Sequence, residues 1–565
     1  MLPKRLRGFC CLWVCLLASC TLASPPVPAT GLQPAGSPTR TPFQPVQNTA
    51  LPEATRTPTA APPPTLTPTL QPPPQTAVWV ESSVPEALRQ AVEAQDGYTL
   101  ANAPEAAALR LAPGDQGSPI RWVYALVTPF PSLVQGVSTA QLRGAWKGEA
   151  AGPFAGRPLL MEPSTAAAFS AVWGPPANGA VQALPAGQLL DAAWNSQPSW
   201  AILPFEALEP RWKALEVDGL SPLHKDFDPD AYALAIPFSL AGEADLAQPL
   251  AALLPASNRD PGRLTVLAMT GVTALVRATA YTMEQKGVLY PGKDVRDWLR
   301  DADLTHISNE VPFAENCPYP DPVQQDMRFC SDPRYIALME DVGTDIVELT
   351  GDHFQDWGKQ AMLYTLDLYR QRGWLYYGGG ANLAEGRQAI TVEDHGNRLA
   401  FIGCNAKGGS YAQAGPDQPG AVRCDLDWMA QEVSRLRSEG YLPVVTFQHF
   451  EYYTYEAQPN QKHDFRQMAD AGAVIVSGSQ AHQPQALEFR NGALIHYGLG
   501  NLFFDQYDVS PACRQAFIDR HIFYDGRFIG TELLPILFID YARPRPMDAG
   551  ERNDLLKAVF AASGW

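Results

Sequence analysis

Five apolar, strand-like runs in the second half of the chain each end in polar residues of the kind that bind metal ions. In chain order these residues are Asn309 and Glu310 after LTHIS, Asp352 and His353 after DIVELT, His449 after LPVVTFQ, His482 after AVIVSGSQA, and Asn501 after ALIHYGLG. In open α/β sheets, ligands and catalytic groups collect beyond the carboxyl ends of the strands. The pattern therefore predicts an α/β fold that gathers these side chains at one edge.

Segments with helical spacing separate the strand-like runs. Residues 361–372 carry apolar side chains at helical spacing, and residues 425–438 form an amphipathic pattern with Asp near the start and Arg near the end. Gly373 lies where the first of these helices should stop. Strands that alternate with helices predict a layered α/β domain over residues 263–542, followed by a C-terminal tail over residues 543–565.

The chain of 565 residues is longer than one hydrophobic core normally fills, so a second domain is expected. Residues 77–255 show short strand and helix patterns that weakly resemble part of a type II periplasmic solute-binding protein. That resemblance implies a smaller α/β domain with a ligand crevice near residues 128–132, in which no individual site residues are assigned. An α/β scaffold that binds nothing is an equal alternative.

The first twenty residues have the pattern of a secretion signal. Lys4, Arg5 and Arg7 precede an apolar stretch that is too short to span a bilayer. The stretch closes with LASC, which resembles a bacterial lipoprotein lipobox and implies cleavage before Cys20 and lipidation of that residue. An ordinary secretory signal is the alternative. Either predicts an extracytoplasmic protein, and the lipobox predicts one that is lipid-anchored to the cell membrane.

Residues 21–76 are rich in Pro, Thr, Ala and Ser, with runs such as APPPTLTPTLQPPP. A segment of this composition cannot bury a core, so it is predicted to be a disordered, extended tether. The formal net charge of -17 argues against nucleic acid as a partner, because phosphate binding needs a basic surface. Oligomeric state is not predicted.

Five cysteines follow the signal, and disulfides are permitted outside the cytoplasm. Sequence proximity favours pairing Cys317 with Cys330 and Cys404 with Cys424, which leaves Cys513 over. Connectivity cannot be deduced from sequence, so other pairings stay open. The mature chain has no CxxC pair, which disfavours a zinc ribbon.

The residue types at the strand ends indicate metal-assisted chemistry. Asp, Glu, Asn and His are oxygen and imidazole ligands of the kind that hold Mn, Zn or Fe. Two such ions about 4 Å apart would clamp a phosphate-like or acyl group and activate a water. A single histidine at a strand end is weak support, and it is the coincidence of several ends that favours a site.

The order of these motifs resembles the CapA-type poly-gamma-glutamate capsule synthesis proteins, which are related to the calcineurin-like metallophosphoesterases. The resemblance rests on Asn309-Glu310, LTGDHFQDWG (349–358), QHF (448–450), SGSQAHQPQ (477–485) and HYGLGNLFFDQ (496–506). It implies a layered α/β sandwich. It also implies that Asp352, His353, His449 and His482 are metal ligands, that Glu310 is a ligand or general base, and that Asn309 and Asn501 position polar groups.

Several residues depart from the family's pattern. Val272 stands where the family has an aspartate, Gly351 where it has an asparagine, and Ser479 and Gln480 where it has histidines. Valine cannot coordinate a cation, so one expected carboxylate is missing. A site with two divalent ions, with one ion or with none is left open.

Three hypotheses about function follow. In the first, the chain handles an anionic capsule polymer such as poly-gamma-glutamate by metal-assisted hydrolysis or transfer at an amide or phosphoester bond. In the second, it is a non-catalytic polymer-binding or scaffold lipoprotein with a degenerate metal site. In the third, residues 77–255 form a solute sensor and the CapA-like part is only structural.

Overall fold

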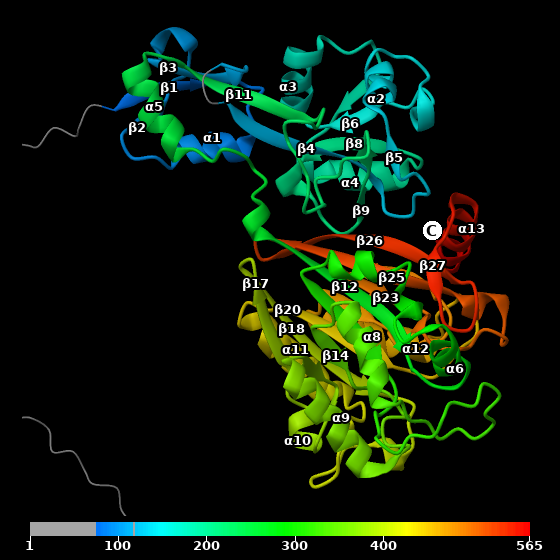
Figure 1. Ribbon diagram of the computed structural model, residues 1–565. Helices are drawn as coiled ribbons and strands as arrows, with labels where there is room; N and C mark the ends of the chain where they lie inside the picture. Colours follow the sequence, from blue (N-terminus) through cyan, green and yellow to red (C-terminus); the bar gives the residue numbers. More distant parts are fainter. Residues whose placement is uncertain (1–74, 117–118) are drawn as a thin grey trace, which may run out of the picture. The chain divides into compact units, whose positions relative to one another are not determined.

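Every element described below lies in residues 75–116 and 119–565 of a computed structural model (Figure 1). The predicted signal peptide, Cys20 and almost all of the predicted tether lie outside the described residues. No helix within the described ranges combines the length and apolar character that a membrane span requires.

The first region is an α/β layer built on one mixed sheet. Its strand order is β2-β1-β3-β11-β4-β8-β6-β7, with β9 paired to β4. The central strand β4 is buried along most of its length, as its sequence IRWVYALVTP requires. The strands are β1 (Thr76–Val80), β2 (Tyr98–Leu100), β3 (Leu109–Pro113), β4 (Ile120–Pro129), β6 (Leu159–Met161), β7 (Val181–Ala183), β8 (Trp200–Pro204), β9 (Trp212–Ala214) and β11 (Ala235–Gly242).

Helices and one short ribbon complete this region. Ser138 caps α2 through a capping box with Gln141, which explains why the helix begins directly after the ribbon strand β5. The helices are α1 (Glu86–Glu93), α2 (Thr139–Trp146), α3 (Pro163–Trp173), α4 (Ala186–Asn195) and α5 (Ala244–Leu253), and the ribbon pairs β5 (Gly136–Val137) with β10 (Glu216–Val217).

The second region contains two sheets that face each other. The first has the order β15-β14-β13-β12-β25-β26-β27 with β24 beside β12, and the second has the order β17-β18-β20-β21-β23-β22. The first sheet's strands are β12 (Leu264–Thr273), β13 (Leu304–Asn309), β14 (Ile346–Glu348), β15 (Leu375–Tyr377), β24 (Asn501–Phe503), β25 (Gln515–Tyr524), β26 (Arg527–Phe538) and β27 (Pro544–Pro546). Those of the second are β17 (Ile390–Asp394), β18 (Asn397–Asn405), β20 (Leu442–Gln448), β21 (Ile475–Ser477), β22 (Leu487–Arg490) and β23 (Ala493–His496).

Alternation along the strands decides which side chains fill which layer. In β20, Val444 packs between the sheets against Met269 of β12, whereas Val445 faces outward toward Met429 of α11. The outer face of the first sheet packs on α6 (Arg277–Lys286), α7 (Arg296–Arg300), α8 (Ile336–Asp341) and α9 (Gly358–Arg372). The outer face of the second packs on α11 (Leu426–Ser438) and α12 (Pro459–Asp470). This layered α/β sandwich confirms the predicted fold class.

The two helices expected from sequence are present. The predicted segment 361–372 forms most of α9, and Gly373 ends that helix in the left-handed region with φ of 72°. Asp425 accepts a hydrogen bond from the Trp428 backbone N–H and so caps α11.

Residues 543–565, expected as a tail, are an ordered part of the sandwich. They form β27 and α13 (Ala549–Ala562), and α13 buries Leu555, Leu556 and Phe560 in the same apolar cluster as strands of both sheets. The Asp548–Glu551 capping box and the spacing of the apolar residues are helix signals in the sequence, but only the structure shows that this helix packs on the sandwich.

Disulfides join Cys317 to Cys330 and Cys404 to Cys424, the pairs that sequence proximity favours. Cys513 is a buried free thiol. The Cys404 pair links β18 to the start of α11, and the Cys317 pair closes a loop between β13 and α8. Both therefore lie near carboxyl ends of strands.

Candidate functional site

The carboxyl ends of strands from both sheets meet at one edge of the sandwich. The first sheet contributes Glu310, directly after β13, and the Asp352-His353 pair after β14. The second contributes the loops after β18, β20 and β21. Parallel pairing of β12, β13 and β14, and of β18, β20, β21 and β23, explains why these ends share one edge.

Glu310, Asp352 and His353 form the centre of this site. A ligand atom from each lies within 4.8 Å of those of the other two, a spacing that suits one metal ion. Gly351 permits the approach, because a Cβ at this position would lie 2.9 Å from the Glu310 Cα and carbonyl oxygen. The departure from the family's asparagine at this position therefore has a steric reason.

Asp356 orients the His353 ring. The Asp356 Oδ2 atom lies 2.6 Å from His353 Nδ1, which leaves Nε2 turned toward Asp352 Oδ1 at 4.0 Å. A carboxylate behind the imidazole is the arrangement that fixes the tautomer of metal-binding histidines. Burial alone would lower the pKa of His353, but Asp356, Glu310 and Asp352 outweigh it and raise the pKa to about 9.

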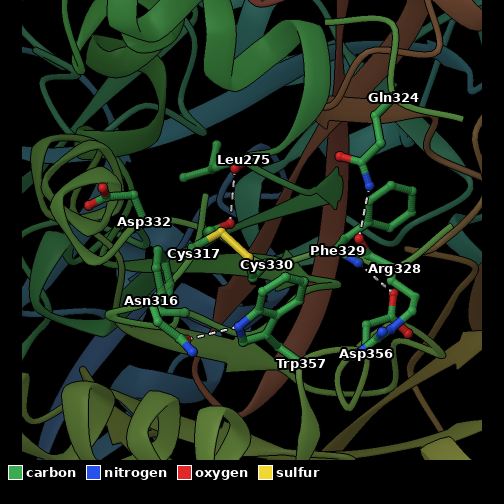
Figure 2. Close-up of a disulfide and its surroundings, with 12 residues drawn as sticks. Leu275, Asn316, Cys317, Gln324, Arg328, Phe329, Cys330, Asp332, Asp356 and Trp357 are labelled. Atoms are coloured by element: carbon green, nitrogen blue, oxygen red, sulfur yellow. Dashed lines mark hydrogen bonds between the residues drawn. A yellow bond between two sulfur atoms is a disulfide. The ribbon is translucent and has the colours of Figure 1, made fainter. Parts of the chain in front are cut away.

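The loop closed by Cys317 and Cys330 holds Asp356 from its other side (Figure 2). The Phe329 backbone N–H donates to Asp356 Oδ2 at 3.0 Å, and Arg328 donates to the Asp356 carbonyl oxygen at 3.3 Å. The Phe329 ring also lies against His353, with 4.8 Å between ring centroids. The disulfide-closed loop is thus a support for the His353–Asp356 pair.

Lys407 and Glu451 complete the cluster, and neither is among the residues predicted from sequence. The Lys407 ammonium lies 3.1 Å from Asp352 Oδ2 and also donates to Glu451. Gln448 donates to Asp352 Oδ1 at 2.7 Å and to Glu310 Oε1 at 3.3 Å. The centre is therefore a set of carboxylates that share cationic and amide donors.

His482 faces the same centre and is held by Asn501. The Asn501 Oδ1 atom lies 2.8 Å from His482 Nδ1, and His482 Nε2 lies 3.5 Å from Glu451 Oε1. Burial alone would lower the pKa of His482, but the Glu451 and Glu310 carboxylates outweigh it and raise that pKa. The structure thus places Asn501 as a positioning residue for an imidazole.

The carboxylates of the centre have divergent proton affinities. Burial raises the pKa of Glu310, which is 1 % exposed. Burial alone would raise the pKa values of Asp352 and Glu451, but it is outweighed by His353 and Lys407 at Asp352, and by His482 and Lys407 at Glu451. Both of those pKa values are lowered. Groups whose environments push their pKa values apart are candidates for separate acid and base roles.

Two of the predicted site residues are directed elsewhere. His449 Nε2 lies 3.0 Å from Asp464 on α12, so His449 is turned away from the cluster. Asn309 donates to the Tyr369 hydroxyl and to the Val311 carbonyl oxygen, both at 2.8 Å. The structure therefore does not bring these two side chains to the centre formed by Glu310, Asp352 and His353.

The residues that depart from the family's pattern take part in apolar packing and hydrogen bonds. Val272 is fully buried in an apolar cluster with Val311, Phe329 and Phe504. The Ser479 hydroxyl donates to the buried Glu348 carboxylate, and Gln480 donates to the Ser308 hydroxyl at 2.6 Å. Apolar packing and hydrogen bonds thus engage these side chains, and the described residues gather one group of three candidate ligand atoms at this edge of the sandwich.

The comparison with known proteins agrees with this order of motifs. The family described as "Bacterial capsule synthesis protein PGA_cap" matches residues 266–506. The "Capsule biosynthesis protein CapA" of Bacillus anthracis is 24% identical over 303 residues, which are 52% of this chain and 72% of that protein. The "PGA biosynthesis protein CapA" of Bacillus subtilis (strain 168) is 25% identical over 279 residues, or 48% of this chain and 70% of that protein.

Residues 266–506 thus form a domain that matches the capsule synthesis protein family of these CapA proteins. Among solved structures, a 5'-nucleotidase precursor of Thermus thermophilus is similar at 13% identity with a TM-score of 0.32, over 53% of this chain and 58% of that one. The matched residues 266–506 contain the whole cluster from Glu310 to Asn501, so the candidate site lies inside the family's own domain.

Proposed function

We propose that this protein acts outside the cytoplasm in making or processing an anionic capsule polymer of the poly-gamma-glutamate type. The match of residues 266–506 to the capsule synthesis family and the names of the two Bacillus relatives support this role. The lipobox-like LASC supports attachment to the cell membrane through Cys20. A tether over residues 21–76 would hold the folded part away from the bilayer surface.

The chemistry proposed for the site is hydrolysis or transfer at an amide or phosphoester bond, with one divalent cation (Mn, Zn or Fe). Glu310, Asp352 and the His353 Nε2 atom would hold the ion. When bound, it would polarise the carbonyl or phosphoryl oxygen of the substrate. The observation that carries this proposal is the convergence of these three ligand atoms within 4.8 Å of one another.

The remaining groups would bind the substrate and move protons. Lys407 carries the positive charge that would attract an anionic polymer and stabilise negative charge that develops in the transition state. Glu310 would hold the ion through one carboxylate oxygen, and its other oxygen would accept a proton from the attacking nucleophile. His482, held at Nδ1 by Asn501, presents its Nε2 atom to the centre and can hand a proton to the leaving group.

Hydrolysis of poly-gamma-glutamate and of a simple phosphodiester by the full chain, with Mn²⁺ and with a chelator, tests this proposal. We expect Mn²⁺-dependent cleavage of one of them and loss of about 100-fold or more in rate for His353→Ala. The matched control is His395→Ala, which removes an imidazole from an acidic surface group elsewhere in the domain. Equal rates for the two variants would contradict the proposal.

A second candidate function is polymer binding without catalysis, and one observation favours it. Lys407 already contacts Asp352 and Glu451, so an ammonium compensates part of the acidic charge without a metal ion. A pure binding site would retain polymer in the presence of a chelator and in His353→Ala. It would lose polymer on Lys407→Met, with no cleavage by any variant.

A further inference from the structure

A cavity of about 290 Å³ lies away from the strand-end site, where β9 meets β26 and α13. All of its lining residues belong to the same compact unit of the described chain. Its lining combines charged and polar side chains with the apolar side chains of Leu534, Leu556 and Phe560. Neither the proposed catalysis nor the family's motifs use these residues.

Lys213 is the unusual residue among the charged and polar side chains of this lining. Its Nζ atom donates one hydrogen bond, to the Ser132 carbonyl oxygen at 2.7 Å, and within the described ranges no carboxylate lies within ion-pair distance of it. An ammonium has three donors, so two are left without a protein acceptor. Glu532 and Glu216 favour the charged form of Lys213 only from beyond ion-pair distance, so a partly buried ammonium lacks a directly paired carboxylate.

Arg520 is a second cation of the same lining, and its unpartnered donor is buried among protein atoms. Its Nη2 atom pairs with Asp301 at 2.7 Å, whereas its Nε atom has no hydrogen-bond partner among the described residues and lies 3.7 Å from Glu532 Oε2. The Arg520 side chain is 9% exposed, so bulk water is largely excluded from it. The Lys213 ammonium is thus a group of this lining with donors left for a bound acceptor.

The acidic groups of the cavity limit the charge of that ligand. Glu532 lies 3.0 Å from His224 Nε2, and Glu216 lines the same cavity. Two carboxylates on the cavity surface would repel a multiply charged anion such as sulfate or phosphate. A single negative charge placed at Lys213 fits better.

We propose that this cavity binds a small organic monocarboxylate, with its carboxylate on the Lys213 ammonium and its apolar body against Leu534, Leu556 and Phe560. The volume is sufficient for a short aliphatic or aromatic acid but not for a polymer chain. The loop that supplies the Ser132 carbonyl oxygen is the one in which sequence resemblance placed a ligand crevice. This site would make residues 77–255 a solute-sensing part of the protein.

The protonation of Lys213 supports the assignment. Burial lowers the pKa of Lys213 to about 7, with a smaller contribution from Arg552. Glu532 and Glu216 partly oppose this lowering, and a carboxylate bound directly at the ammonium would raise the pKa further. An empty cavity therefore leaves an amine that is partly neutral and reactive near neutral pH, which provides a chemical readout for ligand binding.

The test uses the full chain with sodium hexanoate, its neutral isostere hexanol, and sodium sulfate at matched ionic strength. We expect hexanoate to raise Tm by about 2 °C and the other two to leave it unchanged. Lys213→Met should abolish the hexanoate-induced shift, whereas Lys147→Met, at an exposed lysine after α2, should keep it. An equal shift in wild type and Lys213→Met, an equal shift with sulfate or hexanol, or no shift would overturn the proposal.

A second measurement needs no variant. Brief acetylation of the wild-type chain with acetic anhydride, followed by peptide mass spectrometry, reports the reactivity of each lysine. Saturating hexanoate should slow modification of Lys213 about fivefold and leave Lys147 unchanged. An unchanged rate at Lys213, or no modification of Lys213 in either sample, would contradict an open carboxylate site.

Discussion

Two groups in the CapA-like domain have nearly the same composition but different surroundings. Glu310, Asp352 and His353 lie at the carboxyl ends of β13 and β14, and Asp303, Asp394 and His395 lie before β13 and at the end of β17. Each group brings two carboxylates and one imidazole within 4.8 Å. The first is buried or nearly so, whereas the second is partly exposed.

The two groups differ in how far hydrogen bonds from the protein already engage their candidate ligand atoms. Asp303 accepts from the Val266 backbone N–H at 2.9 Å and from Lys225 at 2.8 Å, and Asp394 Oδ2 accepts from the Thr265 hydroxyl at 2.6 Å. These bonds join β12 to the residues around it, so the group of Asp303, Asp394 and His395 has a structural role. This group is called the clasp below. In the buried group, His353 Nε2 and one Glu310 oxygen point into the centre. Residue types alone therefore do not make a cation site.

The largest contrast is expected in cation affinity. His353→Ala should weaken Mn²⁺ binding by about 100-fold, because it removes one of the three ligands that the centre can offer. His395→Ala should change it less than about twofold, since that imidazole lies in the clasp. Isothermal titration of both variants measures the difference, and similar affinities would break the comparison.

Acid should destabilise the sandwich through imidazoles buried behind the site. Burial lowers the pKa of His306 to about 3 and that of His521 to about 4. Because these folded values lie below the unfolded value, the stabilisation is complete above about pH 6.5 and is lost as pH falls toward the folded pKa. Each histidine should contribute a loss of up to about 2 kcal/mol between pH 6.5 and 5.

Urea unfolding at the two pH values measures this loss. His306→Gln should reduce the acid sensitivity, and the surface variant His395→Ala should retain that of the wild type. If His306→Gln and wild type lose equal stability on acidification, the buried imidazole is not the cause.

Removal of the Lys407 ammonium should increase the difference in Mn²⁺ affinity between the two groups. Lys407→Met should strengthen Mn²⁺ binding about tenfold, because Lys407 competes for Asp352 at 3.1 Å. The same change should lower the hydrolysis rate if Lys407 stabilises the transition state. Lys225→Met is the matched control, since Lys225 pairs with Asp303 of the clasp. A second Mn²⁺ site in Lys225→Met would show that the clasp can also bind cations.

The smallest effect is expected from the group that orients His482. Asn501→Ala should leave Mn²⁺ affinity unchanged and lower kcat about fivefold, with a shifted acidic limb of the pH–rate profile. Asn501→Asp should restore much of the rate, because an aspartate oxygen can accept from His482 Nδ1. A fall in kcat without any change in the pH profile would indicate a purely structural role.

The fold and the core of the site were accessible from sequence because strand ends in parallel sheets converge by geometry. Glu310, Asp352, His353, His482 and Asn501 all follow apolar runs, and the structure brings them to one centre. Their order along the chain was also enough to indicate the family, which the comparisons then confirmed.

The remaining parts of the site could not be predicted from sequence, because they depend on side-chain direction and on residue types that are not metal ligands. Successive residues of a strand face opposite ways, so Gln448 points to Asp352 while His449 points to α12. Lys407 follows the strand-like run RLAFIGC, but lysine is not a usual metal ligand, so a pattern of metal-binding residues does not mark it. Glu451 lies three residues beyond the strand-like run LPVVTFQ, after which the pattern of metal-binding residues marks only His449. A search for charged residues of any sign after each strand would have found both.

The number of divalent ions bound by the full chain tests the central claim most directly. Titration with Mn²⁺, followed by electron paramagnetic resonance of the free and bound ion, gives this number without an assay of activity. We expect one ion per chain in the wild type, none in the double variant Asp352→Asn with His353→Ala, and one in His395→Ala. Two ions per chain, or none in the wild type, would contradict a site in which apolar packing at Val272 and the Lys407 ammonium leave room for a single cation.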